Sequence, residues 1–351
     1  MRLRDLWRSS RSDHHPGRAG GGVDIDSLVR DGRLVEAVDR LTARRRDCSP
    51  EAELRLLELR QAATRNYATG PGRAPWPPPY ADPFPDVVDR LPEVETTDLD
   101  ATVLGGAVRH HGCLVVRGLF APDQVARTIE SIRRAAAQRE GNAAAAAEDD
   151  PRVWFRPYPL DEVSAAVRRR VNKNGGTWLA DSPAATAQVL DDLRSAGVID
   201  VITEHLGERP FFSLQKSTLR RSPPDYGVTG WHQDGSFLGP DVRTMNVWIA
   251  LSPCGGNQPS PGMEVVPKRV EELQPTDGIG PVAITGVRVE EVAAGTPMLH
   301  PEFAAGDAML FDERFLHRTY LTREMTEDRY ALETWFFAPS RFTSGYLPFL
   351  V

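Results

Sequence analysis

The sequence predicts an α+β protein with a jelly-roll core, flanking helices and a helical extension at the N-terminus. Helical periodicities dominate the chain up to Pro210, whereas short apolar segments separated by Gly and Pro turns dominate the rest. Many short strands joined by such turns are typical of a β-sandwich or barrel. Because the helices come first and the strands follow, a jelly-roll core fits this order best.

The composition is that of an ordinary globular protein. The chain has 351 residues, of which 40% are apolar and 26% charged, and its formal net charge is −7. This acidic balance argues against broad nucleic-acid binding. No apolar run approaches the roughly 20 residues that cross a bilayer, and the first residues lack the apolar core of a secretory signal. We therefore expect neither nucleic acid nor membrane as a partner, and the sequence leaves the oligomeric state open.

The cysteines indicate the compartment. Cys48, Cys113 and Cys254 lie far apart, without the paired spacing of a zinc site or a disulfide framework. They are predicted to be free thiols, which favours a reducing, cytoplasmic location.

The sequence divides into four parts. Residues 1–22 are rich in Arg, Ser and Gly and are expected to be a disordered tail. Residues 23–70 carry helical periodicity and form the expected extension, and residues 71–90 are a proline-dense linker. The jelly-roll domain is expected over residues 91–351.

The extension is expected to contain two helical stretches. The second starts at Ser49, a capping residue, with Pro50 at its first helical position. Leu54, Leu57 and Leu59 supply its apolar stripe. These apolar positions are too few for an independent core, so we expect the extension to pack on the jelly roll. A partner-docking arm is the alternative.

The elements of the main domain follow in order. A helix ending before Gly112, a buried strand over Cys113–Val116 and a helix from Ala121 come first. The segments 154–156 and 172–178 are expected to be loops, and the sequence leaves open whether they cover a site or pack on the surface. Two short helices and six strands complete the domain, with the helices over 184–198 and 199–206 and the strands over 211–219, 244–251, 262–266, 282–289, 308–312 and 330–337.

Three residues are candidate metal ligands. His232 and Asp234 stand two residues apart, so in an extended segment their side chains point to the same face. His317, which follows the predicted strand 308–312, offers a third ligand. Two histidines and one carboxylate, with the other coordination positions open, form the facial triad of non-haem Fe(II) oxygenases.

An arginine after the triad predicts a co-substrate. Arg329 opens a strand that can return antiparallel from His317 and bring the guanidinium beside the metal. Its planar fork binds a carboxylate with two hydrogen bonds, and the 5-carboxylate of 2-oxoglutarate is such a group. Thr319 points to the same face as His317 and can add a hydroxyl. Arg318 and Arg323 compete for this role, although neither opens a strand.

The chain resembles the phytanoyl-CoA dioxygenase (PhyH) family over roughly residues 91–340. That family includes bacterial hydroxylases of small natural products. The resemblance rests on the His-x-Asp pair, the distal histidine, the arginine after it and three segments, Gly112–Phe120, Pro261–Pro267 and Gly306–Asp312.

The resemblance implies a double-stranded β-helix, which is a jelly roll, with Fe(II) bound by His232, Asp234 and His317. It also implies that Arg329 and Thr319 bind 2-oxoglutarate, and that O2 is the second co-substrate.

Residues on the strand before the His-x-Asp pair line the pocket in the family, so Gln215 and Lys216 are further candidates for binding the co-substrate. The implied reaction is hydroxylation of a C–H bond of a small molecule, with specialised metabolism as its setting. Asp234 favours hydroxylation over halogenation, since the halogenating relatives have a small residue there. A non-oxidative cupin-type metalloenzyme and a non-catalytic jelly-roll binding protein are the alternatives.

Overall fold

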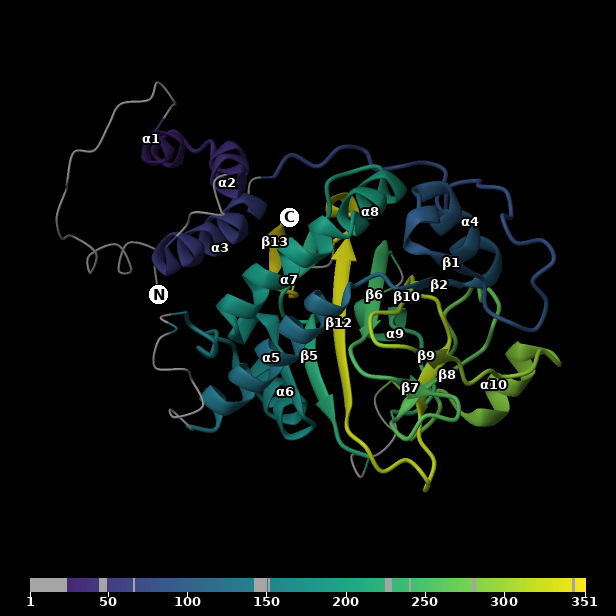
Figure 1. Ribbon diagram of the computed structural model, residues 1–351. Coiled ribbons are helices and arrows are strands. Elements are labelled where there is room, and N and C mark those ends of the chain that lie inside the picture. Colours follow the sequence, from purple (N-terminus) through teal and green to yellow (C-terminus); the bar gives the residue numbers. More distant parts are fainter. Residues whose placement is uncertain are drawn as a thin grey trace.

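Figure 1 shows the computed structural model, in which a small helical lobe lies beside a sheet flanked by helices. The structure describes residues 24–43, 49–65, 67–141, 150, 152–224, 229–239, 241–279, 282–342 and 345–351. The tail predicted over residues 1–22 lies outside the described residues, as does Cys48.

The core is a nine-stranded sheet in which every pair is antiparallel except β1 with β2. The strand order is β1-β2-β10-β6-β12-β4-β13, with β5 beside β12 and β3 beside β5. The strands are β1 Glu93–Glu95, β2 Cys113–Arg117, β3 Gly176–Trp178, β4 Phe211–Ser213, β5 Thr218–Ser222, β6 Thr244–Ala250, β10 Ala308–Phe311, β12 Arg329–Phe337 and β13 Pro348–Leu350.

A second, smaller layer faces this sheet. It consists of two antiparallel pairs, β8 Gly262–Val265 with β11 His317–Tyr320 and β7 Cys254–Gly255 with β9 Glu302–Phe303. Met263 and Val265 of β8 pack with Trp248, Met309 and Ala331 of the large sheet. The two layers form an open jelly roll, as the sequence predicts.

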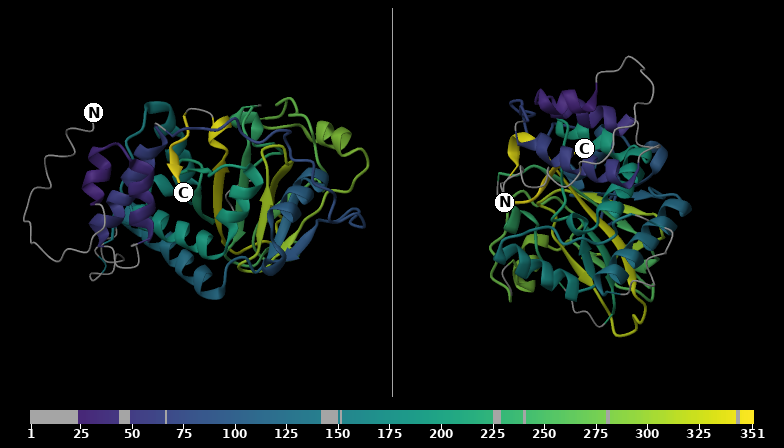
Figure 2. Two further views of the ribbon diagram at one scale, coloured as in Figure 1. Left: turned by 90° about the horizontal axis from the view of Figure 1, so that it is seen from above. Right: turned by 90° about the vertical axis from the view of Figure 1, so that its left-hand side faces the viewer.

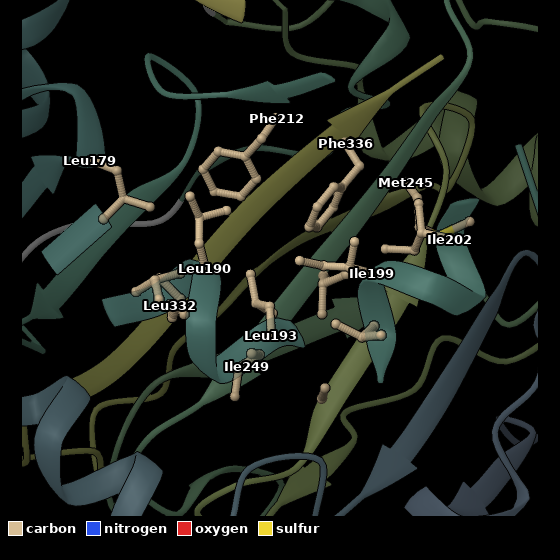
Figure 3. Packing of buried hydrophobic residues seen from close by; sticks show 14 of the residues in the cluster. Leu179, Leu190, Leu193, Ile199, Ile202, Phe212, Met245, Ile249, Leu332 and Phe336 are labelled. Carbon is tan, nitrogen blue, oxygen red and sulfur yellow. The ribbon is translucent and has the colours of Figure 1, made fainter. Parts of the chain in front are cut away.

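Helices cover the opposite face of the large sheet. Met245, Val247 and Ile249 alternate along β6 and join the cluster that the helices bury, whereas Trp248 and Ala250 belong to the cluster inside the jelly roll. Figure 3 shows Leu190 and Leu193 of the helical layer packed over β6 and β12. The helices of this domain are α4 Ala101–His111, α5 Pro122–Arg139, α6 Glu162–Lys173, α7 Pro183–Ser195, α8 Val198–Leu206, α9 Gly235–Leu238 and α10 Gly286–Ala293, with 3-10 turns at Thr96–Asp98, Leu179–Asp181 and Pro339–Arg341.

Two of the predicted elements differ from the structure. The segment 211–219 is two strands, β4 and β5, joined by a turn. The strand predicted over 282–289 is wrong, because α10 begins there. Its start is capped by Thr285, whose side chain accepts a hydrogen bond from the backbone N–H of Arg288 at 3.4 Å.

The segments expected to be loops also carry structure. Gly176–Trp178 forms β3 at the edge of the large sheet, and α6 extends to Lys173. Trp154 is 3% exposed and packs in the main core, with the guanidinium of Arg152 over its ring at 4.8 Å. Within the described residues, no helix combines the length and the apolar character needed to cross a membrane.

The N-terminal extension packs against the end of the large sheet, beside the C-terminal strand (Figure 2). Its described residues form three helices, α1 Ile25–Arg30, α2 Leu34–Ala43 and α3 Pro50–Thr64. The first predicted stretch is split at Gly32, whose φ of 74° ends α1.

The side of α3 that is buried is shifted from the predicted stripe. Leu56 and Leu59 are buried in a cluster that contains Phe211 and Leu350 of the sheet. Between them and Ala63, Arg60 is 2% exposed and donates a hydrogen bond from Nη1 to the carbonyl of Leu350 at 2.7 Å. This interface supports packing over free display of the extension.

Deleting residues 1–70 is expected to lower the melting temperature. The deletion exposes the sheet residues that Leu56 and Leu59 cover, and a buried leucine stabilises a fold by about 1.5–3 kcal/mol. Thermal unfolding of this deletion should be compared with deletion of residues 1–22, which is expected to melt like the full chain. Equal melting of all three proteins would mean that the extension serves a partner and not the fold.

The proline-dense segment runs over α4 and α8. Trp76 meets the ring of His205 edge-on at 5.3 Å, and Tyr80 stacks on the same ring at 6.4 Å. His205 is 2% exposed, and burial lowers its pKa to about 4. The folded protein therefore holds this imidazole neutral in mildly acidic solution.

This histidine makes stability depend on pH. Below the ordinary value of 6.5, the unfolded chain binds a proton at His205 that the folded chain does not, so stability falls as the pH falls. The loss from this group is expected to reach about 2 kcal/mol near pH 5. Urea unfolding near pH 7 and pH 5 measures it, and His205→Gln should reduce the difference by about that amount. An unchanged difference would contradict the assignment.

Candidate metal and co-substrate site

The three predicted ligands lie together between the two layers. His232 and His317 form an isolated β-bridge, in which the N–H of His232 donates to the carbonyl of His317 at 3.0 Å and the reverse bond measures 3.1 Å. Asp234 follows two residues later and directly precedes α9. One side-chain donor atom from each of the three residues lies within 4.8 Å of the others.

The hydrogen bonds around the three side chains leave atoms with free lone pairs that can bind a cation. Nδ1 of His232 lies 2.9 Å from the carbonyl of Gly230, and Nδ1 of His317 lies 3.0 Å from that of Phe315. Because a carbonyl can only accept, each Nδ1 carries the proton and each Nε2 keeps a lone pair, which is the usual arrangement of metal-binding histidines. Oδ2 of Asp234 is buried and has no hydrogen-bond partner among the described residues.

The electrostatics favour the same conclusion. Burial lowers the pKa of His232 and of His317, so both imidazoles are neutral, as metal ligands must be. Burial raises the pKa of Asp234 well above its usual value, and the nearby Glu333 raises it further. A buried carboxylate between two neutral imidazoles is stabilised by a divalent cation, and this donor set is that of the Fe(II) facial triad. The residues therefore fit the metal.

Arg329 lies beside the second strand pair. It is 7% exposed, its Nη1 donates to the carbonyl of Gly262 at 3.0 Å, and its guanidinium lies 5.7 Å from the centre of the Trp248 ring. Gly262 pairs with Tyr320 at the far end of β11 from His317. Thr319 lies between these two ends, so a co-substrate carboxylate reaching from the metal towards Arg329 would pass it.

The competing arginines are placed elsewhere. Arg318 is bound to the carboxylate of Glu264 and lies over the ring of Trp231 at 4.9 Å. Arg323 is exposed in the loop before β12. Neither lies on β12, so the geometry favours Arg329.

Gln215 and Lys216 lie in the turn between β4 and β5. Gln215 is 8% exposed. Nζ of Lys216 lies 4.2 Å from the centre of the Phe237 ring, and its charge is attracted by Asp234 and Glu333. Along β12, Glu333 is four residues from Arg329, so Lys216 is near the opposite end of the site. Binding of the co-substrate by Gln215 and Lys216 stays a prediction, and this separation places Lys216 away from Arg329.

An ion pair inside the jelly roll was not predicted from the sequence. Oε2 of Glu333 accepts hydrogen bonds from Arg220 Nε at 2.8 Å and Nη2 at 2.7 Å, and Oε1 accepts one from Trp335 Nε1 at 3.3 Å. The alternation of β12 places Glu333 on the same face as Arg329, and this signal could have identified it. Arg220 follows only from the register of β5 with β12, which the sequence does not state.

Comparisons with known proteins identify the family of this chain. The model of the family described as phytanoyl-CoA dioxygenase (PhyH) matches residues 108–323, which include the triad and Thr319 and end before Arg329. The 1-deoxypentalenic acid 11-beta-hydroxylase of Streptomyces exfoliatus is 24% identical over 257 residues, covering 68% of this chain and 79% of that protein.

Two solved structures are similar to this chain. EctD from S. alaskensis, solved with 2-oxoglutarate and 5-hydroxyectoine, has a TM-score of 0.48 at 20% identity, covering 66% of this chain and 73% of that one. The non-heme alpha ketoglutarate dependent carbocyclase SnoK from nogalamycin biosynthesis has a TM-score of 0.46 at 15% identity, covering 74% and 99%. Since the family model spans well over half of the sequence, the chain belongs to the phytanoyl-CoA dioxygenase (PhyH) family.

Proposed function

We propose that His232, Asp234 and His317 hold one Fe(II), and that Arg329 and Thr319 bind the distal carboxylate of 2-oxoglutarate. The observation that carries this proposal is the set of three donor atoms, one from each imidazole and one from the carboxylate of Asp234, within 4.8 Å of one another. Arg329 supports the co-substrate part, because its guanidinium is held at the end of β12 that faces the β8–β11 pair.

As a member of the family, the chain is an Fe(II)- and 2-oxoglutarate-dependent dioxygenase that uses O2. The iron and the co-substrate, when bound, supply the oxidising chemistry. The protein positions and protects it. Phe311 packs on the ring of His317 at 4.9 Å, and Trp248 lies beside Arg329. These apolar side chains exclude water from the reacting groups.

Hydroxylation of a small molecule is the reaction that this site supports best. Asp234 supplies a carboxylate at the position where halogenating relatives have a small residue, so the third protein ligand is present. The relative from Streptomyces exfoliatus is, by its name, a hydroxylase of 1-deoxypentalenic acid. We therefore place this enzyme in specialised metabolism.

A cytoplasmic location is part of the proposal. Cys113 and Cys254 are free and buried, and burial raises the pKa of Cys254 to about 12. Thiols of this kind suit a reducing compartment.

Succinate formation tests the proposal. The purified enzyme with Fe(II) and 2-oxoglutarate should form succinate and consume O2, and compounds from a panel of small natural products should raise this rate. His317→Ala should be inactive in the same assay. Turnover of a compound without O2 would instead favour the non-oxidative cupin-type enzyme, and absence of both iron and 2-oxoglutarate binding would favour a non-catalytic protein.

A further inference from the structure

Lys216 takes no part in the proposed iron site and lies away from Arg329. Its Nζ is held between two aromatic rings, 4.2 Å from the centre of Phe237 and 4.9 Å from that of Tyr346. The two rings are fixed to each other, because Oη of Tyr346 donates to the backbone carbonyl of Phe237 at 2.7 Å. Phe237 belongs to α9, the helix that Asp234 precedes. The ammonium is therefore positioned at one side of the triad.

The ammonium lacks an acceptor. Among the described residues, Nζ of Lys216 makes no hydrogen bond and no ion pair, and the side chain is partly buried. The nearby carboxylates have other partners, because Arg220 and Trp335 occupy the oxygens of Glu333, and Asp234 belongs to the triad. A cation that is partly removed from water and has no acceptor on the protein is less favourable than a fully solvated one. Contact with ring faces compensates only part of this cost.

The co-substrate does not supply this acceptor. Arg329 and Glu333 are separated by roughly 13 Å along β12, and the guanidinium of Arg329 is directed at Gly262. The terminal carbons of 2-oxoglutarate are only about 5 Å apart. A molecule that reaches from the metal to Arg329 would commit one carboxylate to the metal and the other to Arg329, so another ligand is the better counterion for Lys216.

We propose that Lys216 binds the carboxylate of the substrate, and that the substrate is a small monocarboxylic acid with an apolar carbon skeleton. This inference rests on the proposed function, since it assigns a group of the molecule that the triad oxidises. Phe237 and Tyr346, which are both partly exposed, give this side of the site an aromatic wall. A single ammonium matches one carboxylate, whereas a phosphate dianion would call for further donors.

Binding of a matched pair of probes tests the inference. Cyclohexanecarboxylate and cyclohexanecarboxamide have the same skeleton and differ in charge. Each is titrated by calorimetry, without O2, into the enzyme loaded with Fe(II) and 2-oxoglutarate. The wild type is expected to bind the acid about tenfold or more tightly than the amide. Lys216→Met should abolish this preference, and Lys216→Arg should keep it.

Arg221→Met is the matched control. It also removes one positive charge and lies five residues further along the chain, on β5, but its side chain is 58% exposed and is paired with Asp328. It should bind both probes like the wild type. The affinity for 2-oxoglutarate should be unchanged in all of these variants, and their melting temperatures should agree.

Three results would overturn the inference. They are a wild type that does not prefer the acid, a Lys216→Met variant that keeps the preference, and a Lys216→Met variant that loses 2-oxoglutarate affinity instead, which would place Lys216 in the co-substrate site. Each of these leaves the proposed function standing if the wild type binds Fe(II) and 2-oxoglutarate. A wild type that binds neither contradicts the proposed function itself.

Discussion

Replacing Asp234 by Ala is expected to abolish Fe(II) binding and turnover without unfolding the protein. Asp234 supplies the only carboxylate oxygen among the three donor atoms. Loss of a group that merely supports a metal ligand weakens binding about 10- to 100-fold, so loss of a ligand should cost more. The folded state of the metal-free variant should not suffer, because burial disfavours the charged form of Asp234 and raises its pKa.

Iron content after anaerobic loading and thermal unfolding of the metal-free protein measure the two parts of this expectation. Asp241→Ala is the matched control, since Asp241 is an exposed acid a few residues further along the chain. It should bind iron like the wild type. The ligand assignment would be refuted if Asp234→Ala bound iron in full and hydroxylated at the wild-type rate.

Arg329→Ala is expected to raise the concentration of 2-oxoglutarate needed for turnover and to leave iron binding nearly intact. A charge-assisted, two-pronged hydrogen bond contributes about 1.5–3 kcal/mol, which corresponds to a change of about ten- to a hundredfold in affinity. Arg329→Lys should restore little of this, because an ammonium lacks the planar fork. Calorimetric titration of the iron-loaded variants with 2-oxoglutarate gives the dissociation constants.

Arg323→Ala provides the comparison for this experiment. Arg323 is exposed and lies in the loop before β12, so its removal should not change co-substrate affinity. If Arg323→Ala weakened the binding of 2-oxoglutarate and Arg329→Ala did not, the carboxylate would be bound by Arg323, and the assignment to Arg329 would be wrong.

Four strands around the site could be predicted because each of them is a local apolar run in the sequence. The segments that became β6, β8, β10 and β12 are apolar runs with Gly and Pro turns, and the structure has strands at each of them. The segment 282–289 failed because Val287 and Val289 alternate like a strand, while the cap at Thr285 decides for a helix. Val287 is exposed, so its apolar side chain does not mark a position in the core.

The parts of the candidate site that could be predicted are those formed by residues close together in the sequence. His232 and Asp234 are close in sequence, and His317 and Thr319 share a face of β11. The strands that pair with each end of β12 are set by long-range register, which the sequence does not show. The ion pair of Glu333 with Arg220 and the position of Lys216 both depend on how β5 pairs with β12.

In the N-terminal extension, the start of a helix could be predicted from the sequence, but its buried face could not. The cap at Ser49 and Pro50 located the start of α3 correctly. The buried face of α3 is centred on Leu56 and Leu59, because the position of β13 decides which side of the helix is covered. A helix of this kind has leucines on more than one side, so periodicity alone does not select the face.

Anaerobic absorption spectroscopy tests the iron and co-substrate assignment most directly. Fe(II) chelated by 2-oxoglutarate has a metal-to-ligand charge-transfer band in the visible region. We expect the wild type with both additions to show this band, His317→Ala to lack it, and Arg329→Ala to show it only at higher 2-oxoglutarate concentrations. A band of full strength in His317→Ala, or none in an iron-loaded wild type with saturating 2-oxoglutarate, would contradict the account.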